Sequence, residues 1–291
     1  MIIVNCHSSY LGEYRWSAAA LVTGASSGIG GSTARKLARI GYTVYGAARR
    51  TDRLQELASD GIIPLGMDVT DGQSMQEGVA RIIADAGRID VRVNNAGYGS
   101  YGAVEDVDMD EARRQFEVNV FGGMNLTRLV LPHMRAQKSG TIVNITSMGG
   151  KIYTPLGGWY HGTKFALEAL SDCLRLEVAP FGINVVVIEP GGIATEWGGI
   201  AAANLEKTSG SGPYKAQAEA VGKSLRSEAN ANRNSPPSVI SDAIAKAVTA
   251  RRPKTRYAVG FGARPLIAAG AVLSDRQFDA LISRATGVPR S

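Results

Sequence analysis

The sequence predicts an α/β fold in which one doubly wound parallel sheet is covered by helices on both faces. Short apolar runs alternate along the chain with stretches of helical periodicity. The runs are apolar almost throughout, which is typical of strands that are buried on both faces. Glycine is also frequent, at 35 of 291 residues, as many tight strand-to-helix turns require.

The predicted elements follow one another in regular alternation. The predicted strands are the short apolar runs 18–23, 42–47, 63–67, 91–94, 140–145 and 183–188. The clearest helical patterns cover 30–40, 109–131 and 160–178. We expect residues 18–291 to form a single domain. Residues 1–17 lack the basic start, apolar centre and cleavage site of a secretion signal. We interpret them as a leader of another kind or as an upstream extension of the start site.

Two segments depart from this pattern. Residues 201–237 are rich in Ala, Ser, Gly, Asn and Lys and have few large apolar side chains, so we predict a flexible substrate lid. Arg92 interrupts strand 91–94, which should be buried. Either its guanidinium reaches a strand end, or the strand is less stable than normal, because a buried unpaired charge is costly.

The net charge of +6 lies entirely in the tail. From residue 251 onward there are eight Arg and Lys and two Asp, which accounts for the whole excess. No stacked aromatic residues or nucleic-acid motif accompany these charges, so we interpret them as a solvated surface and expect no nucleic-acid partner. Binding to an anionic ligand or a membrane surface is the alternative interpretation.

Composition also limits compartment and metal content. Two cysteines are too few for a disulfide framework, which indicates a reducing compartment and favours the cytoplasm. The three His and two Cys have no metal-ligand spacing, so no metal site is expected. No run reaches the roughly 18 apolar residues that a membrane span needs.

A glycine-rich turn stands where the first strand leads into the first helix. Gly24 permits the tight turn, Gly28 lets the backbone approach a pyrophosphate, and Gly30 lets helix and strand pack closely. The helix N-terminus that follows faces the anion. We therefore predict a Rossmann-type dinucleotide site that includes the residues between these glycines: Ser26, Ser27 and Ile29.

The end of the second strand distinguishes between the two nicotinamide dinucleotides. An acidic residue there would accept hydrogen bonds from the ribose of NAD, but the chain has Ala47 and Ala48 followed by Arg49 and Arg50. A guanidinium pairs bidentately with phosphate, so Arg49 predicts NADP(H) through its 2′-phosphate. The alternative is that both arginines only solvate a loop.

Tyr160 and Lys164 are four residues apart, which places them on one face of a helix. A phenol normally titrates near pH 10, and a nearby cation lowers its pKa towards the range useful for acid–base chemistry. Ser147 lies upstream at the end of an apolar run. Alone it would be read as a helix cap; beside Tyr160 it predicts a catalytic group.

These motifs together resemble the short-chain dehydrogenase/reductase family in its single-domain branch, densely over residues 18–195. The resemblance rests on the glycine turn, Asn-Asn-Ala-Gly at 94–97, and the later positions Asn119, Ser147, Tyr160, Lys164, Pro190, Gly191 and Thr195. The sequence around Arg49 and after Arg251 is also similar to that of members that act on hydroxysteroids and retinoids.

The resemblance implies an oxidoreductase that interconverts a carbonyl and an alcohol by hydride transfer with NADP(H). Tyr160 would donate the proton to the carbonyl oxygen, and Ser147 would hold that oxygen by a hydrogen bond. Lys164 would lower the Tyr160 pKa and bind the nicotinamide ribose, and Asn119 would hold a water. The other implied cofactor contacts are Asp68, Val69, Asn95, Ala96, Gly97, Pro190, Gly191, Ile193 and Thr195.

Aromatic residues beside these motifs indicate an apolar pocket for a bulky ketone or secondary alcohol. The predicted substrate contacts are Tyr98, Tyr153, Trp159 and Trp197, with Tyr101 and Leu156 nearby. Several of these could instead be core or subunit contacts. By resemblance, helices 109–131 and 160–178 would pair between subunits and give a homodimer or homotetramer.

Two alternative functions belong to other classes. One is a catalytically silent NADP-binding regulator on the same fold, which is disfavoured because Asn119, Ser147, Tyr160 and Lys164 are all present. The other is a basic surface-binding protein, for which the tail charge is the only support. The sequence favours the enzyme.

Overall fold

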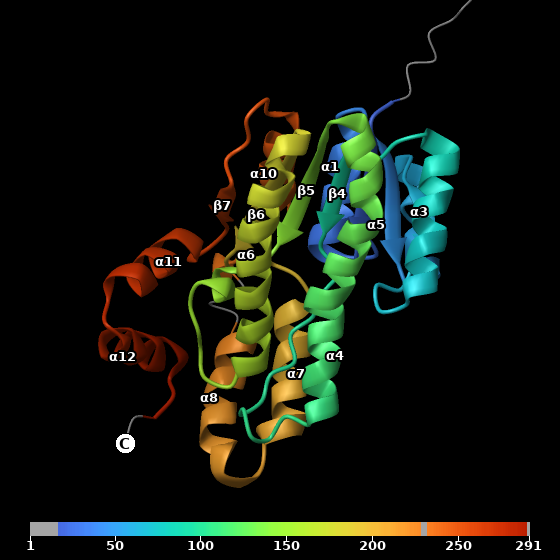
Figure 1. Cartoon of the computed structure of the whole chain (residues 1–291). Helices are drawn as coiled ribbons and strands as arrows, with labels where there is room; N and C mark the ends of the chain where they lie inside the picture. Colours follow the sequence, from blue (N-terminus) through green and yellow to red (C-terminus); the bar gives the residue numbers. More distant parts are fainter. Residues whose placement is uncertain (1–16, 228–231, 290–291) are drawn as a thin grey trace, which may run out of the picture.

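A seven-stranded parallel sheet forms the centre of the computed structural model, which describes residues 17–227 and 232–289 (Figure 1). Its strand order is β3-β2-β1-β4-β5-β6-β7. The strands are β1 (Ala19–Thr23), β2 (Thr43–Ala48), β3 (Ile63–Gly66), β4 (Val91–Asn94), β5 (Gly140–Ile145), β6 (Ile183–Pro190) and β7 (Arg256–Val259). Because β2 and β4 flank β1 on opposite sides, the direction of winding reverses at β1. The predicted Rossmann-type fold is confirmed.

Helices cover both faces of this sheet, and others lie beside it. They are α1 (Gly28–Arg39), α2 (Thr51–Gln55), α3 (Gly72–Ala86), α4 (Met109–Phe116), α5 (Gly122–Gln137), α6 (Gly158–Val178), α7 (Trp197–Ser209), α8 (Lys215–Arg226), α10 (Ser238–Thr249), α11 (Ala263–Val272) and α12 (Asp275–Thr286). One core cluster joins the sheet to α1 and α10, and a second joins it to α3 and α5. Within the described ranges, no helix is both long enough and apolar enough to cross a membrane.

The six predicted strands are all present, with ends that differ from the prediction by at most two residues. The seventh strand, β7, was not predicted. It pairs with β6 in parallel from Arg256 to Val259, and all four of its residues are only partly buried. A four-residue edge strand that begins with a charged residue lacks the continuous apolar run on which the prediction relied. The predicted leader lies outside the described residues, apart from Ser17.

The long helix predicted over 109–131 is interrupted. It consists of α4, a π-helical turn at Glu117–Phe121, and α5. A π turn adds a residue to the helical repeat, and such turns are frequent at functional sites. Here the turn carries Asn119.

Helices make up most of the segment predicted to be a lid, and whether it acts as a lid stays a prediction. Its described part is mostly helical, and α7 and α8 lie beyond the carboxyl ends of the strands (Figure 1). Ala201 and Leu205 on α7 are buried together with Ala218 and Val221 on α8. Apolar residues recur at spacings of three and four and form a stripe on each helix. Because many side chains in this segment are small, its overall composition does not reveal that stripe.

Arg92 remains fully buried in β4, so its guanidinium does not reach solvent at a strand end. Nη1 donates to Thr127 Oγ1 at 2.9 Å and Nη2 donates to the Gly123 carbonyl at 2.9 Å. The Nε atom has no hydrogen-bond partner. Burial lowers the pKa of Arg92 to about 9. Two neutral acceptors therefore replace the counter-ion that a buried cation usually requires.

We predict that Arg92→Met raises the free energy of unfolding by about 1–3 kcal/mol, because a flexible apolar chain fills the space without a buried charge. Thr127 keeps a partner in this variant, since its hydroxyl also donates to Gly123 at 2.9 Å. Denaturant unfolding measures the change. The control is Arg128→Met on exposed Arg128, which should shift stability by less than about 0.5 kcal/mol. A loss of stability in the Arg92 variant would show that its hydrogen bonds outweigh its desolvation.

Candidate active site

The predicted site residues lie together at the carboxyl edge of the sheet. The glycine turn follows β1, Arg49 follows β2, and Asp68 and Val69 follow β3. Residues 95–97 follow β4, Ser147 follows β5, and the segment from Gly191 to Thr195 follows β6. All the strands are parallel, so these ends share one edge, with the glycine turn and residues 95–97 at the reversal point.

The glycine turn presents an uncapped helix N-terminus. Gly24 and Gly28 have positive φ angles of 65° and 54°. At Gly30 an added Cβ would lie 2.2 Å from the Gly24 carbonyl, so no side chain fits there. Ser27 is the N-cap of α1, but its side chain makes no capping hydrogen bond. The first N–H groups of α1 are therefore without a side-chain cap, in the arrangement that binds phosphate groups.

Thr23 and Asn95 join this turn to the end of β4. Thr23 Oγ1 accepts hydrogen bonds from the backbone N–H groups of Asn95 and Ala96 at 3.1 and 3.2 Å. The Asn95 amide donates to the carbonyls of Thr23 and Gly24 at 3.0 and 3.3 Å. Across the turn, the Thr195 methyl lies 3.3 Å from the position of a Cβ on Gly28. The glycine turn is thus flanked by the segments that follow β4 and β6.

The two arginines after β2 lie in different surroundings. Arg50 Nη2 reaches Ser26 Oγ in the glycine turn at 3.4 Å. Arg49 is exposed, and its charge acts on Asp68. Burial alone would raise the pKa of Asp68, but hydrogen bonds from Thr70 and the charge of Arg49 together hold that pKa below its usual value. Basic side chains therefore border both the phosphate-type turn and the end of β3.

Ser147, Tyr160 and Lys164 come together between β5 and α6. The Ser147 side chain lies close enough to the Tyr160 hydroxyl to act on its pKa. Its Oγ also accepts the Gly149 N–H at 3.0 Å, which fixes the short turn after β5. Lys164 Nζ donates to the Ile145 carbonyl at 3.0 Å and lies 5.9 Å from the centroid of the Tyr160 ring. The predicted grouping is therefore present in the structure.

The electrostatics of Tyr160 differ from the sequence expectation. Burial raises the pKa of Tyr160 to about 12, and the hydrogen bond with Ser147 acts in the opposite direction. The Lys164 ammonium group, which lies over the ring and is bonded to Ile145, does not offset this effect of burial. Burial also lowers the pKa of Lys164 to about 8, against the opposing charge of Glu168. The buried phenol is therefore protonated at neutral pH.

Asn119 connects the segment after β4 to α6. Its Oδ1 accepts the Tyr98 N–H at 2.9 Å, and its Nδ2 donates to the Tyr98 carbonyl at 2.9 Å and to Thr163 Oγ1 at 3.1 Å. These bonds give Asn119 a structural role, and the water predicted at this residue stays a prediction.

His161 is likewise structural: its ring nitrogens contact the Gly149 carbonyl at 2.8 Å and the Thr154 N–H at 3.0 Å.

The four predicted substrate contacts have separate environments. Trp197 packs against Tyr160, with ring centroids 5.2 Å apart, and Tyr101 packs against both rings. Tyr98 instead donates its hydroxyl to Glu111 at 2.9 Å. Tyr153 donates to Asp279 on α12 at 3.1 Å, and Trp159 donates to the Val104 carbonyl at 3.2 Å. Trp197 and Tyr101 therefore border the Tyr160 phenol, as does the ring of His161.

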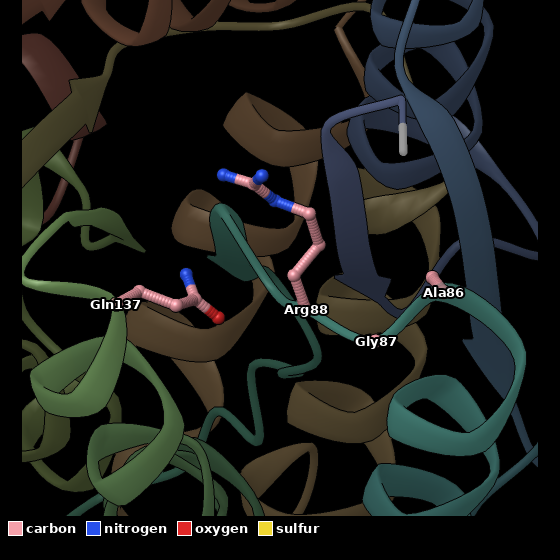
Figure 2. A pocket seen from close by; sticks show the side chains of 4 residues that line it. All are labelled: Ala86, Gly87, Arg88 and Gln137. Carbon is pink, nitrogen blue, oxygen red and sulfur yellow. The ribbon is translucent and has the colours of Figure 1, made fainter. Parts of the chain in front are cut away.

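A surface hollow of about 270 Å³ lies at the other end of the sheet (Figure 2). It is lined by Ala86, Gly87 and Arg88, which precede β4, and by Gln137 at the end of α5. Arg88 Nε donates to Asp90 at 2.8 Å, and Gln137 bonds the backbone of Ile89 in both directions. Both polar side chains are satisfied within the protein, so this hollow does not belong to the candidate site.

The chain matches the family model described as short chain dehydrogenase over residues 18–204. It belongs to the short-chain dehydrogenase/reductase family. It is 37% identical to an oxidoreductase, BOA17, from Botryotinia fuckeliana, over 82% of this chain and 87% of that protein. It is also 37% identical to a 3-ketodihydrosphingosine reductase from Bacteroides thetaiotaomicron, with the same shares covered. An NADPH-dependent 3-dehydrocapnine reductase from Ornithobacterium rhinotracheale is 33% identical over 89% of this chain and 94% of that protein.

Solved structures give the same family. A short-chain dehydrogenase from Streptomyces avermitilis has a TM-score of 0.78 at 33% identity, covering 94% of this chain and 99% of that chain. A metagenomic short-chain oxidoreductase in complex with NADP has a TM-score of 0.66 at 26% identity, covering 83% and 96%. The protein is therefore an oxidoreductase that acts on CH–OH groups, as the sequence predicted.

One buried acidic residue of this short-chain dehydrogenase was missed by the sequence analysis. Glu168 on α6 is 3% exposed and accepts the Thr146 hydroxyl at 2.6 Å. It also pairs with Lys151 and Arg256, each at 3.1 Å. Its position four residues after Lys164, on the same helix face, was a usable signal.

Lys164 gives the short-chain dehydrogenase a testable pH dependence. Since burial lowers its pKa to about 8, the ammonium form is present below that pH and lost as the pH rises through it. Tyr160 stays protonated in this range. We predict that kcat for carbonyl reduction falls as the pH rises from about 7 to about 10. The NADPH dissociation constant over the same range is the control, and a rate that is constant or rising would contradict the prediction.

Proposed function

We propose that this short-chain dehydrogenase is an NADPH-dependent reductase of a carbonyl group on a bulky apolar substrate, with the alcohol oxidation as its reverse. The observation that carries the proposal is the pairing of Ser147 with the buried Tyr160 hydroxyl, with Lys164 one turn further along α6. This pair lies at the same sheet edge as the uncapped N-terminus of α1. A proton donor and a phosphate-binding helix end therefore share one edge.

The side chains have distinct roles in the proposed reduction. NADPH, when bound, supplies the hydride that reaches the carbonyl carbon. Tyr160 donates its proton to the oxygen that becomes negative, and Ser147 holds that oxygen with a hydrogen bond. The raised pKa of Tyr160, about 12, keeps the donor protonated and favours the reductive direction. The cation of Lys164 stabilises the negative charge that Tyr160 gains when it releases the proton.

The residues fit the pyrophosphate and the 2′-phosphate of NADPH. Gly30 brings the start of α1 against the β1 turn, which leaves backbone N–H groups facing the position of a pyrophosphate. Arg49 and Arg50 supply two exposed guanidinium groups after β2, where no acidic side chain competes for the ribose. The NADP complex of the metagenomic relative supports the same cofactor class for this chain.

The proposed substrate pocket lies beneath α7 and α8, which would act as its lid. Tyr101, Leu156 and Tyr160 share an apolar cluster with Leu205 of α7 and Val221 of α8. Trp197 at the start of α7 packs against this cluster. An apolar group next to the reacting carbonyl would replace contacts of this kind. Two relatives named as reductases support the reductive direction.

Two further parts of the proposal concern the whole molecule. Phe121 beside α5 and Phe165 and Leu176 on α6 are large apolar residues with exposed fractions of 54%, 44% and 72%. Such residues favour pairing of these helices in a homodimer or homotetramer.

The continuous sheet supports one domain over residues 18–291, and the free Cys173 supports the cytoplasm as the location.

NADPH consumption with a panel of ketones and aldehydes tests the proposed function. We expect turnover to favour bulky apolar carbonyls over small ones such as acetone, because the cluster under α7 and α8 is apolar. NADH should be the poorer cofactor. Tight NADPH binding without turnover of any compound would contradict the proposal and favour the silent regulator.

Arg49→Asp tests the cofactor assignment. We predict that the ratio of kcat/KM with NADPH to that with NADH falls roughly a hundredfold, because a charge-assisted phosphate contact becomes a repulsion. Arg39→Asp at the exposed far end of α1 carries the same charge change and should leave the ratio unchanged. Equal ratios in wild type and the Arg49 variant would overturn the assignment.

A further inference from the structure

Glu168 holds both ends of the turn that carries Ser147. On one side, its Oε1 accepts the Thr146 hydroxyl at 2.6 Å, one residue before Ser147. On the other side, its Oε2 meets Lys151 Nζ at 3.1 Å, just after the turn. Between them, a Cβ on Gly150 would lie 3.0 Å from the Glu168 side chain, so the turn packs directly on this residue. One carboxylate thus spans residues 146–151.

The same carboxylate is fixed to the sheet and to the catalytic helix. Arg256 on β7 donates to Oε2 at 3.1 Å, and Thr146 Oγ1 also lies 3.0 Å from the Ile188 carbonyl on β6. Glu168 itself is one turn after Lys164 and two turns after Tyr160 on α6. A shift of its side chain would therefore move the Ser147 turn relative to Tyr160.

The cost of this arrangement argues for a specific role. Burying a carboxylate is unfavourable unless charged partners and hydrogen bonds compensate for lost solvation. Asp172, one turn further along α6, already anchors Arg256 through Nη2 at 2.5 Å and is partly exposed. The junction of α6 with β7 thus has a less costly ion pair. The contacts specific to Glu168 are those with the Ser147 turn.

We propose that Glu168 is a positioning residue that sets the Ser147 hydroxyl against the Tyr160 hydroxyl, acting through Thr146 and Lys151. This inference rests on the proposed function and adds the residue that fixes the position of Ser147 relative to Tyr160. Its charge also bears on Lys164, whose cationic form it favours. The other charged groups around it are Lys151, Arg256 and Glu189, whose carboxylate lies 3.5 Å from Arg256.

Thr146→Val is the first test, because it removes only the hydroxyl that joins Glu168 to the Ser147 turn. We expect kcat to fall roughly tenfold or more, since small misplacements of catalytic groups have effects of this size. Substrate KM and NADPH affinity should stay within about twofold of wild type. Thr146→Ser restores the hydroxyl and should recover kcat. The matched control is Asp172→Asn, which weakens the Arg256 anchor on the same helix and should leave kcat near wild type.

Glu168→Gln is the second test and has a readout that loss of packing alone would not move. It keeps an oxygen for Thr146 but removes the negative charge, so the midpoint of the fall in kcat with pH should move to lower pH. In Asp172→Asn that midpoint should stay in place. The inference is overturned if Thr146→Val matches wild type, if its loss equals that of Asp172→Asn, or if the Glu168→Gln midpoint is unchanged. An inactive wild type would instead refute the proposed function.

Discussion

The contact between Thr23 and the Asn95 segment is the constraint on which the rest of the site depends. It joins β1 and β4 at the point where the winding of the sheet reverses, so the glycine turn and the chain after β4 occupy fixed positions. The other candidate site residues lie at the same edge of the sheet, because they follow parallel strands that all end there. Thr23 and Asn95 satisfy each other's polar groups, and the N–H groups at the start of α1 stay available.

Burial, more than charge, determines the acid–base properties of the site. Tyr160 lies under Trp197 and Tyr101, and desolvation moves its pKa upward while it moves that of Lys164 downward. Sequence spacing placed the two side chains on one face but gave no information on the dielectric around them or on the direction of the ammonium group. Glu168 opposes the shift at Lys164 because it brings a negative charge into the same buried region.

Most of the fold could be predicted, since the strands β1 to β6 are mainly apolar and the motifs fall at their ends. The failures have physical causes. Strand β7 is short and starts at Arg256, whose charge is used in ion pairs with Glu168 and Asp172. The helices α7 and α8 pack through small residues, and a segment rich in such residues has the composition that is typical of a loop. The fully buried Arg92 depends on acceptors from α5, which only the tertiary structure brings to β4.

The measurement that tests the central claim most directly is the transfer of deuterium from NADPH deuterated at the nicotinamide C4, in wild type and in Tyr160→Phe. The account predicts deuterium on the alcohol carbon of the wild-type product. It predicts almost none with Tyr160→Phe, although that variant should bind NADPH with unchanged affinity, because it lacks only the proton donor. Equal deuterium incorporation by the two proteins would show that Tyr160 is not the group that protonates the carbonyl oxygen.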